Sequence, residues 1–486
     1  MTDKKGSVAL IGAGPGEAGL FTLRGRELLE AADCVVYDRL VGDGVLAMMP
    51  AAAEKISVGK TGGGPSAAQR EIEEILVREA KKGRRVARLK GGDPFLFGRG
   101  GEEIEALNRE GIPFEVVPGV TSALAGPACA GIPVTHRGIA RSVHIITAHT
   151  KEGTIAPVDY ESLAKLGGTL VFLMGAGAAA EICAALINAG MGADTPAAAV
   201  ENASTAAQRL IGGTLATLAA ACAEQKLKSP ALIVVGAVTA FAEEFAWKKF
   251  LPLAGRKIIV TRPRERAGRL AAMLRERGAE VVELPSISTR RISAELPDFA
   301  KYGWFGFTSM TGVEALFALL AETGRDVRSL GAAKIAAIGP ATAKALRERG
   351  LLTDYVPEVY DGVHLARGLA ALAQDTPILM IRAKEGSPEL TAELAARELD
   401  FTELPLYETI YEKAETIPQG ADTAIFTSAS TVRGFKAAMP ELAIERACCI
   451  GEQTAAEARR AGFKRIITAQ KATLESLINT LEEDIR

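Results

Sequence analysis

The chain lacks any apolar run of about 20 residues, which is the length that crosses a membrane. Its first residues, MTDKKGSVALIG, also lack the apolar region and cleavage site of a secretory signal. The six cysteines form no CxxC pair, which disfavours a zinc ribbon or a thioredoxin-type site. We therefore expect a soluble, cytoplasmic protein with no membrane partner.

Neither sign of charge is in excess, because 57 Lys and Arg residues balance 59 Asp and Glu residues. This balance argues against a general nucleic-acid binder, whose surface is strongly basic, so we expect no nucleic-acid partner. Three histidines, His136, His144 and His149, lie partly across a strand at a spacing that does not suit a compact metal site. We therefore expect no metal.

The length of 486 residues is too great for a single hydrophobic core. Apolar runs typical of strands alternate with helical stretches, as at VALIG (8–12), CVVYD (34–38), RVARL (85–89) and FEVVPG (114–119). This alternation predicts an α/β fold with largely parallel sheets.

A linker is indicated within residues 245–256, where a polar stretch that contains proline and glycine precedes a new apolar run at 257–261. We expect two parts, residues 1–250 and 254–486.

The second part contains an internal repeat. VTRPRE (260–265) matches MIRAKE (380–385), and further pairs follow at a similar offset: VELP (282–285) with TELP (402–405), GFTSMTGVEA (306–315) with IFTSASTVRG (425–434), and AAIGPATAKALRERG (336–350) with CCIGEQTAAEARRAG (448–462). Such a duplication predicts two similar α/β lobes. Facing surfaces of two like lobes form a natural cleft for a ligand.

The first part opens on VALIGAGPGEAGLFTL (8–23), which looks like a nucleotide-binding turn. A dinucleotide fingerprint needs G-x-G-x-x-G and an acidic residue about 20 positions later. Counting from Gly12, Glu17 occupies the third glycine position, and Pro15 removes an N–H group that a pyrophosphate could use. Asp38 follows the next strand and keeps the dinucleotide interpretation open.

Four later segments also end strands in small residues, which let backbone approach a flat nucleoside closely. These are RLKGGDPFLFGRGGEE (88–103), VVPGVTSALAGPACAGIPVTHRG (116–138), LVFLMGAG (170–177) and SPALIVVG (229–236). Any one glycine pair is equally compatible with an ordinary turn. Together with GAGPGEAGLFTLRG, YDRLV and VGK, in this order, the set resembles uroporphyrinogen-III C-methyltransferase, a family of tetrapyrrole methylases, over roughly residues 6–245.

This resemblance implies a cleft between two α/β subdomains, S-adenosyl-L-methionine as methyl donor and a homodimer formed through this half. It places donor contacts at Pro15, Gly91, Gly92, Asp93, Leu96, Thr121, Ser122, Met174 and Ala203. It makes Asp38 the candidate base, because a proton must leave the acceptor carbon after methylation. A strand-end cap or an ion pair with Arg39 or a lysine remains an alternative for Asp38, and core packing remains one for Met174.

A tetrapyrrole acceptor carries several carboxylates, which a positive cleft attracts. The candidate cations are Lys60, Lys90, Arg99, Arg137 and Arg141. Each of them is equally compatible with a solvated surface charge. The chain departs from the family pattern at Thr61, Pro65, Ala148 and Ala203.

The repeat motifs VTRPRE, GFTSMTGVEALF, AAIGPATAKALRERG, ELPLYETI and IFTSASTVRGF resemble uroporphyrinogen-III synthase over roughly residues 255–483. That family closes linear hydroxymethylbilane into a ring without a cofactor. The resemblance implies that the two lobes exchange segments, and we place the two crossings at Glu283–Pro285 and Glu403–Pro405.

Tyr407 is the residue expected to assist the leaving hydroxyl group, with packing between the lobes as the alternative. Hydroxyl groups that would line the cleft are those of Thr308, Ser309, Thr342, Thr427, Ser428 and Thr454. Hydroxyls after strands are also ordinary helix N-caps.

These observations predict a bifunctional enzyme that makes precorrin-2 from hydroxymethylbilane, with small-molecule tetrapyrroles as its substrates. Three alternatives stay open. The first half could methylate another acceptor, the second half could be a non-catalytic module that binds carboxylates, or the chain could be an NAD oxidoreductase.

Overall fold

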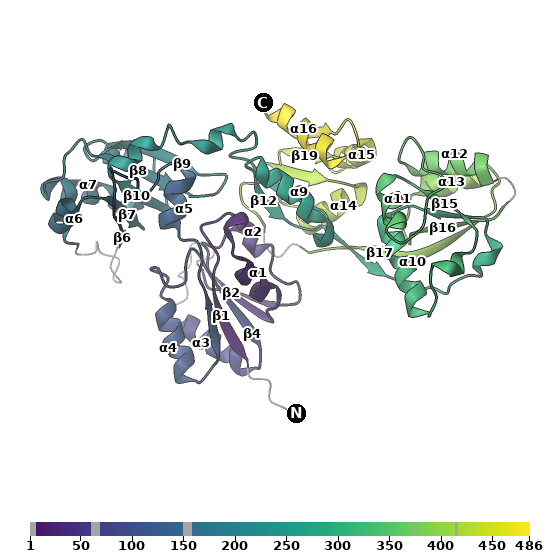
Figure 1. The fold of residues 1–486 in the computed structure, drawn as a ribbon, viewed down its shortest axis with the longest axis horizontal. Helices are drawn as coiled ribbons and strands as arrows, with labels where there is room; N and C mark the ends of the chain where they lie inside the picture. The colour runs from purple at the N-terminus through teal and green to yellow at the C-terminus, as the bar shows by residue number, and fades with distance from the viewer. Residues whose placement is uncertain (1–5, 60–68, 149–157, 374–375, 414–416) are drawn as a thin grey trace. The chain divides into compact units, whose positions relative to one another are not determined.

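The computed structural model describes residues 6–59, 69–148, 158–373, 376–413 and 417–486 (Figure 1). Within these residues the strands form four sheets of five strands each. The chain divides into two compact units. The first comprises Met1–Pro285, Ala414–Val432 and Met439–Arg486, and the second comprises Ser286–Lys413 and Arg433–Ala438. No helix among the described residues is both long and apolar enough to cross a membrane.

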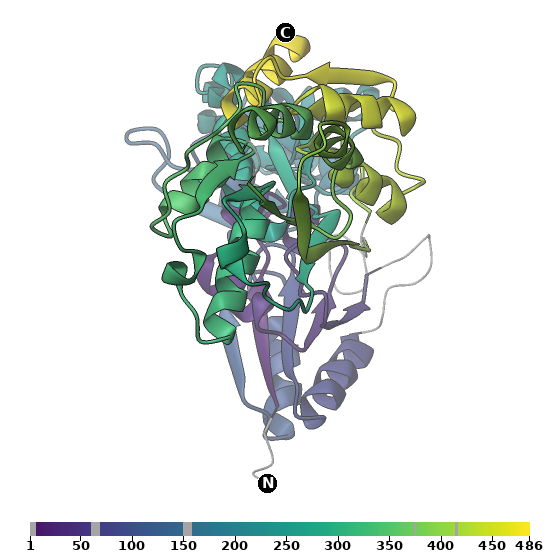
Figure 2. The same cartoon turned by 90° about the vertical axis from the view of Figure 1, so that its right-hand side faces the viewer.

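The first sheet has the strand order β3-β2-β4-β1-β5, and every pairing in it is parallel. Its strands are β1 (Ser7–Gly12), β2 (Cys34–Tyr37), β3 (Glu54–Ser57), β4 (Arg85–Lys90) and β5 (Phe114–Val117). The helices are α1 (Leu23–Glu30), α2 (Asp43–Leu46), α3 (Gln69–Lys81) and α4 (Gly100–Arg109). The four strands predicted from apolar runs are confirmed. Parallel neighbours place all their carboxyl ends, and the loops that follow, at one edge (Figure 2).

The second sheet has the order β6-β7-β10-β8-β9. Its strands are β6 (Val143–Thr147), β7 (Thr169–Leu173), β8 (Pro196–Glu201), β9 (Arg209–Thr214) and β10 (Ala231–Val235). The helices are α5 (Ser122–Cys129), α6 (Tyr160–Leu166), α7 (Ala179–Asn188) and α8 (Leu218–Glu224). Only β6 and β7 pair in parallel, and the other pairings are antiparallel. The expectation of a largely parallel sheet is wrong here. For β8 and β9 the reason is that loop 202–208 between them is too short for a parallel crossover.

The predicted linker is packed against the structure that follows it. A 3-10 helix spans Trp247–Phe250, and Leu253 is then fully buried in the same hydrophobic cluster as α9 (Arg264–Glu276). The backbone N–H of Leu253 donates to the carbonyl oxygen of Arg277 at 2.9 Å. The division of the chain at 250 and 254 stays a prediction.

The remaining two sheets form two lobes. The first lobe has the parallel order β12-β11-β18-β19-β20. Its strands are β11 (Lys257–Val260), β12 (Glu280–Glu283), β18 (Thr423–Phe426), β19 (Arg446–Cys449) and β20 (Arg465–Thr468), and its helices are α9, α14 (Ala429–Ala438), α15 (Glu452–Arg460) and α16 (Leu474–Ile485).

The second lobe has the order β13-β17-β16-β14-β15, in which only β13 and β17 pair antiparallel. Its strands are β13 (Ile287–Arg291), β14 (Trp304–Phe307), β15 (Lys334–Ala337), β16 (Ile378–Ala383) and β17 (Phe401–Tyr411). Its helices are α10 (Met310–Glu322), α11 (Pro340–Arg347), α12 (Gly362–Ala373) and α13 (Pro388–Ala396).

The internal repeat and the lobes do not coincide. The repeated motifs equate β11 with β16, β12 with β17, β14 with β18 and β15 with β19. The two sheets place equivalent strands in the same order, β12-β11-β18-β19 and β17-β16-β14-β15. Each lobe therefore combines the first half of one repeat with the second half of the other, which confirms that the lobes exchange segments.

The first predicted crossing is confirmed and the second is wrong. Strand β12 ends at Glu283, and the second unit begins directly after Pro285. Glu403–Pro405 instead lies inside β17, in register with β16, and the chain stays in the second lobe to Lys413. Pro405 is tolerated inside the sheet because the register of this ladder shifts at that point, where a strand hydrogen bond is not required.

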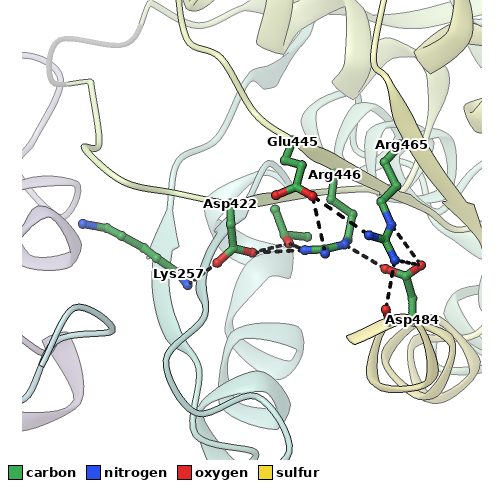
Figure 3. A network of polar contacts seen from close by, with 7 residues as sticks. Lys257, Asp422, Glu445, Arg446, Arg465 and Asp484 are labelled. Carbon is green, nitrogen blue, oxygen red and sulfur yellow. Dashed lines mark hydrogen bonds and ion pairs between the residues drawn. The ribbon is translucent and has the colours of Figure 1, made fainter. Parts of the chain in front are cut away.

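A buried arginine fastens the end of the chain to the first lobe (Figure 3). Arg446 is 4% exposed, and its Nε atom lies 2.8 Å from Oδ2 of Asp484 on α16. Its Nη1 atom donates to Oγ1 of Thr423 at 3.1 Å, while Asp422 accepts a hydrogen bond from the backbone N–H of Lys257. Helix α16 packs against β19 and β20 at the yellow end of the chain (Figures 1 and 2). Strands from both ends of residues 254–486 thus depend on one polar network.

Replacing this arginine tests the network. We expect Arg446→Met to lower the free energy of unfolding by about 3 kcal/mol, because it leaves carboxylates without their buried partner. Thermal unfolding followed by circular dichroism measures the loss. The matched control is Arg269→Met, which removes an exposed ion pair between α9 and α16 and is expected to change stability by less than about 1 kcal/mol. Equal effects of the two variants would contradict this account.

Candidate functional site

Three loops meet at the carboxyl edge of the first sheet. Gly14, after β1, and Gly92, after β4, exchange two backbone hydrogen bonds, with N···O distances of 3.2 and 2.7 Å. Asp93 accepts a hydrogen bond from the backbone N–H of Gly119, after β5, through Oδ2 at 3.0 Å. These contacts hold the three loops as one surface.

The approach of these loops depends on the absence of side chains. A Cβ atom on Gly119 would lie 2.1 Å from the carbonyl oxygen of Gly92 and 2.6 Å from Cα of Gly12. A Cβ atom on Gly12 would in turn lie 2.5 Å from Cα of Gly119. Backbone cannot move aside as a flexible side chain can, so each of these positions requires glycine. The small residues thus allow the backbones of the loops to touch one another, while their close approach to a nucleoside stays a prediction.

Asp93 organises the loop that follows β4. Its Oδ1 atom accepts hydrogen bonds from the backbone N–H groups of Phe95 at 2.8 Å and Leu96 at 3.0 Å, while Oδ2 holds Gly119. Leu96 packs against the buried cluster under the second sheet. Gly91 is also tightly placed, since its Cβ position would lie 2.6 Å from Cβ of Leu40. The contacts of these residues with a methyl donor stay predictions.

Asp38 follows β2 at the same edge. Its Oδ1 atom accepts a hydrogen bond from the backbone N–H of Leu40 at 3.0 Å, and its Oδ2 atom accepts one from Gly91 at 3.4 Å. Nη1 of Arg88 lies 3.8 Å from Oδ2. A cap and an ion pair are therefore both present at Asp38, but the predicted ion-pair partner, Arg39 or a lysine, is wrong, because Arg88 holds that place. The side chain is nevertheless 28% exposed, which leaves it accessible to a ligand.

A buried charge cluster lies beneath this edge. Nζ of Lys90 and Nε of Arg88 approach Oε1 of Glu103 at 2.8 and 3.1 Å, and all three side chains are at most 5% exposed. Burial lowers the pKa of Lys90, and so does the neighbouring Arg88 charge, while Glu103 opposes both effects. The prediction that Lys90 attracts a substrate from solution is wrong, because its ammonium group is buried and pairs with Glu103.

The second sheet adds further predicted residues to the same surface. The backbone N–H of Glu17 donates to Oγ of Ser204 at 3.2 Å, so the loop after β1 is joined to the loop after β8 that carries Ala203. A Cβ atom on Gly16 would lie 2.8 Å from Cγ2 of Thr205. Ala203 itself is 8% exposed and belongs to the cluster that includes Leu96.

Met174 lies directly after β7 with a backbone φ of 58° and a side chain that is 52% exposed. The alternative of core packing is therefore wrong. A left-handed backbone is unfavourable for a non-glycine residue, and such strain is often found at functional sites. Thr121 caps α5 by accepting from the backbone N–H of Ala123 at 3.3 Å, and Ser122 is the first residue of that helix.

Sequence reasoning missed three exposed apolar side chains in these loops, Leu40, Phe95 and Phe97, which are 60%, 58% and 43% exposed. The available signal was the presence of large apolar residues within glycine-rich loops. Arg99 is exposed and pairs with Glu102, and Arg137 is exposed as well. Lys60, Thr61, Pro65 and His149 lie outside the described residues. The part of the chain that the structure describes contains no group of three metal-ligating side chains.

In the second lobe, Tyr407 and Ser309 form a pair. The hydroxyl of Tyr407, on β17, lies 2.7 Å from Oγ of Ser309, and Tyr407 is 8% exposed. Ser309 also caps α10, because its Oγ atom accepts from the backbone N–H of Gly312 at 3.0 Å. Thr308 donates its hydroxyl to the carbonyl oxygen of Ile381 at 3.3 Å. The N-cap alternative is confirmed for Ser309.

The other predicted hydroxyls differ in access. Thr342 and Thr454 occupy equivalent positions in α11 and α15, and each is 4% exposed. Ser428 follows β18 and accepts from the backbone N–H of Thr431 at 3.3 Å, as an N-cap does, while Thr427 beside it is partly exposed. Substrate contacts for this set stay predictions, and burial leaves the two helix threonines least accessible.

Comparison with known proteins decides the family. Residues 7–219 match the family model of tetrapyrrole (corrin/porphyrin) methylases, and residues 268–479 match that of uroporphyrinogen-III synthase HemD. The chain is 44% identical over 494 residues to the porphyrin biosynthesis protein HemD of Ruminiclostridium josui, covering 98% of both chains. The chain belongs to the family of this porphyrin biosynthesis protein HemD. It joins a methylase half to a synthase half, and both halves belong to enzyme families.

Other relatives match one half each. The siroheme synthase of Citrobacter koseri is 50% identical over 245 residues, which cover 50% of this chain and 53% of that protein. The uroporphyrin-III C-methyl transferase of Thermus thermophilus, solved with S-adenyl homocysteine, is 42% identical over 48% of this chain and 99% of its own, with a TM-score of 0.42. The uroporphyrinogen-III synthetase of Helicobacter pylori is 21% identical over 48% of this chain and all of its own, with a TM-score of 0.37.

The glycine contacts of the methylase half can be tested by adding one carbon atom. We expect Gly119→Ala to destabilise the protein by about 1–3 kcal/mol, because the new methyl group overlaps backbone atoms of two other loops. Thermal unfolding measures this loss. The matched control is Gly101→Ala, on α4, where the new Cβ atom has no neighbour within 4 Å apart from the backbone of its own helix. This change is expected to be neutral or slightly stabilising. A neutral Gly119→Ala would contradict the described packing.

Proposed function

We propose that the chain is a bifunctional enzyme of tetrapyrrole synthesis. The synthase half cyclises hydroxymethylbilane to uroporphyrinogen III without a cofactor, and the methylase half methylates this product twice with S-adenosyl-L-methionine to give precorrin-2. The observation that supports this most strongly is the convergence of glycine loops around Asp38 in a chain of this family. Precorrin-2 would then enter a route to sirohaem or to a cobalamin.

The carboxyl edge of the first sheet suits a flat nucleoside. The backbones of Gly12, Gly92 and Gly119 touch without side chains between them, so a planar ligand can approach the main chain closely. Pro15 lacks an N–H group, which makes the loop a poor holder of paired phosphates. When bound, S-adenosyl-L-methionine supplies an electrophilic methyl group. The residues proposed to hold it are Pro15, Gly91, Gly92, Asp93, Leu96, Thr121, Ser122, Met174 and Ala203.

Asp38 is proposed as the base that accepts the proton released from the methylated carbon. Backbone N–H groups and Arg88 hold its carboxylate in a fixed orientation, which is what a general base requires. The exposed apolar side chains of Leu40 and Phe95 offer a surface for the face of a tetrapyrrole. Arg99 and Arg137 would bind its carboxylates through charge-assisted hydrogen bonds.

Tyr407 is proposed to donate a proton to the hydroxyl group that leaves hydroxymethylbilane. Its hydrogen bond with Ser309 fixes the position of the phenol, and its burial limits access of water. Exclusion of water protects a reactive cationic intermediate from hydrolysis. The hydroxyls of Thr308, Thr342, Thr427, Ser428 and Thr454 are proposed to help hold the substrate. A cytoplasmic homodimer formed through the methylase half completes the proposal.

A one-pot reaction with hydroxymethylbilane and S-adenosyl-L-methionine tests both activities. We expect a type III ring that has gained two methyl groups, measured by product mass and isomer analysis. A different number of methyl groups would indicate another acceptor or another reaction. Only the spontaneous type I ring would indicate that the synthase half is a binding module.

Asp38→Asn tests the proposed base. Asparagine keeps an oxygen that can accept from the backbone of Leu40 but cannot take up a proton, so we expect methylation to fall by about 10²–10⁴-fold. Ring closure by the synthase half should stay unchanged. The matched control is Asp33→Asn, an exposed carboxylate that pairs with Arg85 at the opposite edge of the sheet. Unchanged methylation by Asp38→Asn would exclude Asp38 as the base.

Tyr407→Phe tests the proposed acid of the synthase half. The ring is kept and the hydroxyl is lost, so we expect the rate of type III formation to fall by about 10²-fold or more while methylation of added uroporphyrinogen III continues. Tyr411→Phe, at the exposed end of the same strand, serves as the control. Full activity of Tyr407→Phe would assign the tyrosine to packing alone.

A further inference from the structure

A lysine of the first lobe of the synthase half joins two carboxylates from different halves of the protein. Nζ of Lys257, at the start of β11, lies 2.6 Å from Oδ2 of Asp43 and 3.0 Å from Oε1 of Glu280. Asp43 belongs to the methylase half, where it begins α2, the helix that follows Asp38. The three side chains are 12%, 23% and 9% exposed. Helix α2 packs against β12 in the same unit (Figure 1).

Glu280 extends this contact to a second loop of the methylase half. Its Oε2 atom accepts a hydrogen bond from the backbone N–H of Ala206 at 2.7 Å. Ala206 lies in the same loop as Ala203, in which Asn202 and Ser204 have left-handed φ angles of 48° and 68°. Non-glycine residues hold such angles only where their surroundings impose them. The carboxylate of Glu280 is one of those surroundings.

The hydrogen bond from Ala206 to Glu280 lies at the wall of a cavity. A space of about 420 Å³ is lined by Ser204, Thr205 and Ala206 on one side and by Arg275 and Glu280 on the other. Side chains do not fill this space, so the side of the loop that faces it lacks packing contacts, whereas Ala203 packs into the hydrophobic cluster that includes Leu96. The hydrogen bond from Ala206 to Glu280 holds the loop on the side of the cavity.

The charges of the contact support one another. Burial lowers the pKa of Lys257, but the adjacent carboxylates of Glu280 and Asp43 outweigh it, so the pKa is raised and the ammonium stays charged. Without the cation, two partly buried carboxylates would face each other without compensation. Loss of Lys257 should therefore displace both α2 and Glu280.

We propose that Lys257 and Glu280 of the synthase half are positioning residues for methyl transfer, and we call them, with Asp43, the brace. This inference rests on the proposed function of the methylase half. The brace holds the loop of Ala203, proposed to contact the donor, and the segment that follows Asp38. The synthase half would thereby hold the methylase site in position, in addition to making the substrate that is methylated.

Ring closure should not depend on the brace. Lys257 and Glu280 stand at the amino ends of the parallel strands β11 and β12, whereas Thr427 and Ser428 follow the carboxyl end of β18 in the same sheet. Synthase activity of each variant therefore reports whether the first lobe is intact.

The test measures binding of S-adenosylhomocysteine by calorimetry, with both activities, in the full chain. We expect Lys257→Met and Glu280→Ala each to weaken binding by about 10-fold and to raise KM for the donor similarly. Ring closure should stay within about 2-fold of the unmodified protein. Lys257→Arg should restore binding, and Glu280→Gln, which keeps an oxygen for Ala206, should lose less than Glu280→Ala.

A matched control removes another cation of the same lobe. Arg277→Met breaks the ion pair with Glu482, whose Oε1 atom lies 2.6 Å from Nε of Arg277, and it should leave donor binding unchanged. Unchanged binding by Lys257→Met and Glu280→Ala would overturn the brace. If Lys257→Met or Glu280→Ala fails to fold, the other of the two is decisive. Full binding by the one that folds, together with wild-type binding by Lys257→Arg and Glu280→Gln, overturns the brace. An unmodified protein that neither binds S-adenosylhomocysteine nor methylates uroporphyrinogen III would instead refute the proposed function.

Discussion

The methylase half depends on the contact of three glycine backbones at one edge of a parallel sheet. Gly12, Gly92 and Gly119 lie so close that a single methyl group on Gly119 would overlap main-chain atoms of the other loops. Parallel pairing brings the ends of β1, β4 and β5 to this edge, and Asp93 fastens the last two loops together. The surface that results is made of backbone atoms.

The synthase half shows a different constraint, which is the exchange of half-repeats between lobes. Neither repeat closes a sheet alone, because β11 and β12 need β18 and β19 beside them, and β14 and β15 need β16 and β17. The first lobe is therefore assembled from both ends of this half, and Arg446 ties the last helix to it through Asp484. The same lobe contacts the methylase half through Lys257. The two halves thus share contacts within one compact unit.

Local patterns in the sequence were sufficient for the strands of the first sheet, the glycine loops and the two similar lobes, since each depends on residues close in sequence or on direct repetition. The exchange of segments between the lobes came from the family resemblance. They were insufficient where long-range contacts decide. The antiparallel pairing of β8 with β9 follows from a short loop, and Pro405 lies inside β17 where the register of the ladder shifts. The exposure of Met174 and the pairing of Lys90 with Glu103 depend on neighbours from distant segments. No sequence pattern indicates that Lys257 meets Asp43.

The central claim is that the glycine surface of the methylase half holds a sulfonium nucleoside and not a dinucleotide. Isothermal calorimetry of the unmodified full chain with S-adenosylhomocysteine and, separately, with NAD tests it most directly. The account predicts saturable heat of binding for the first ligand and none for the second. Binding of NAD without any binding of S-adenosylhomocysteine would contradict it.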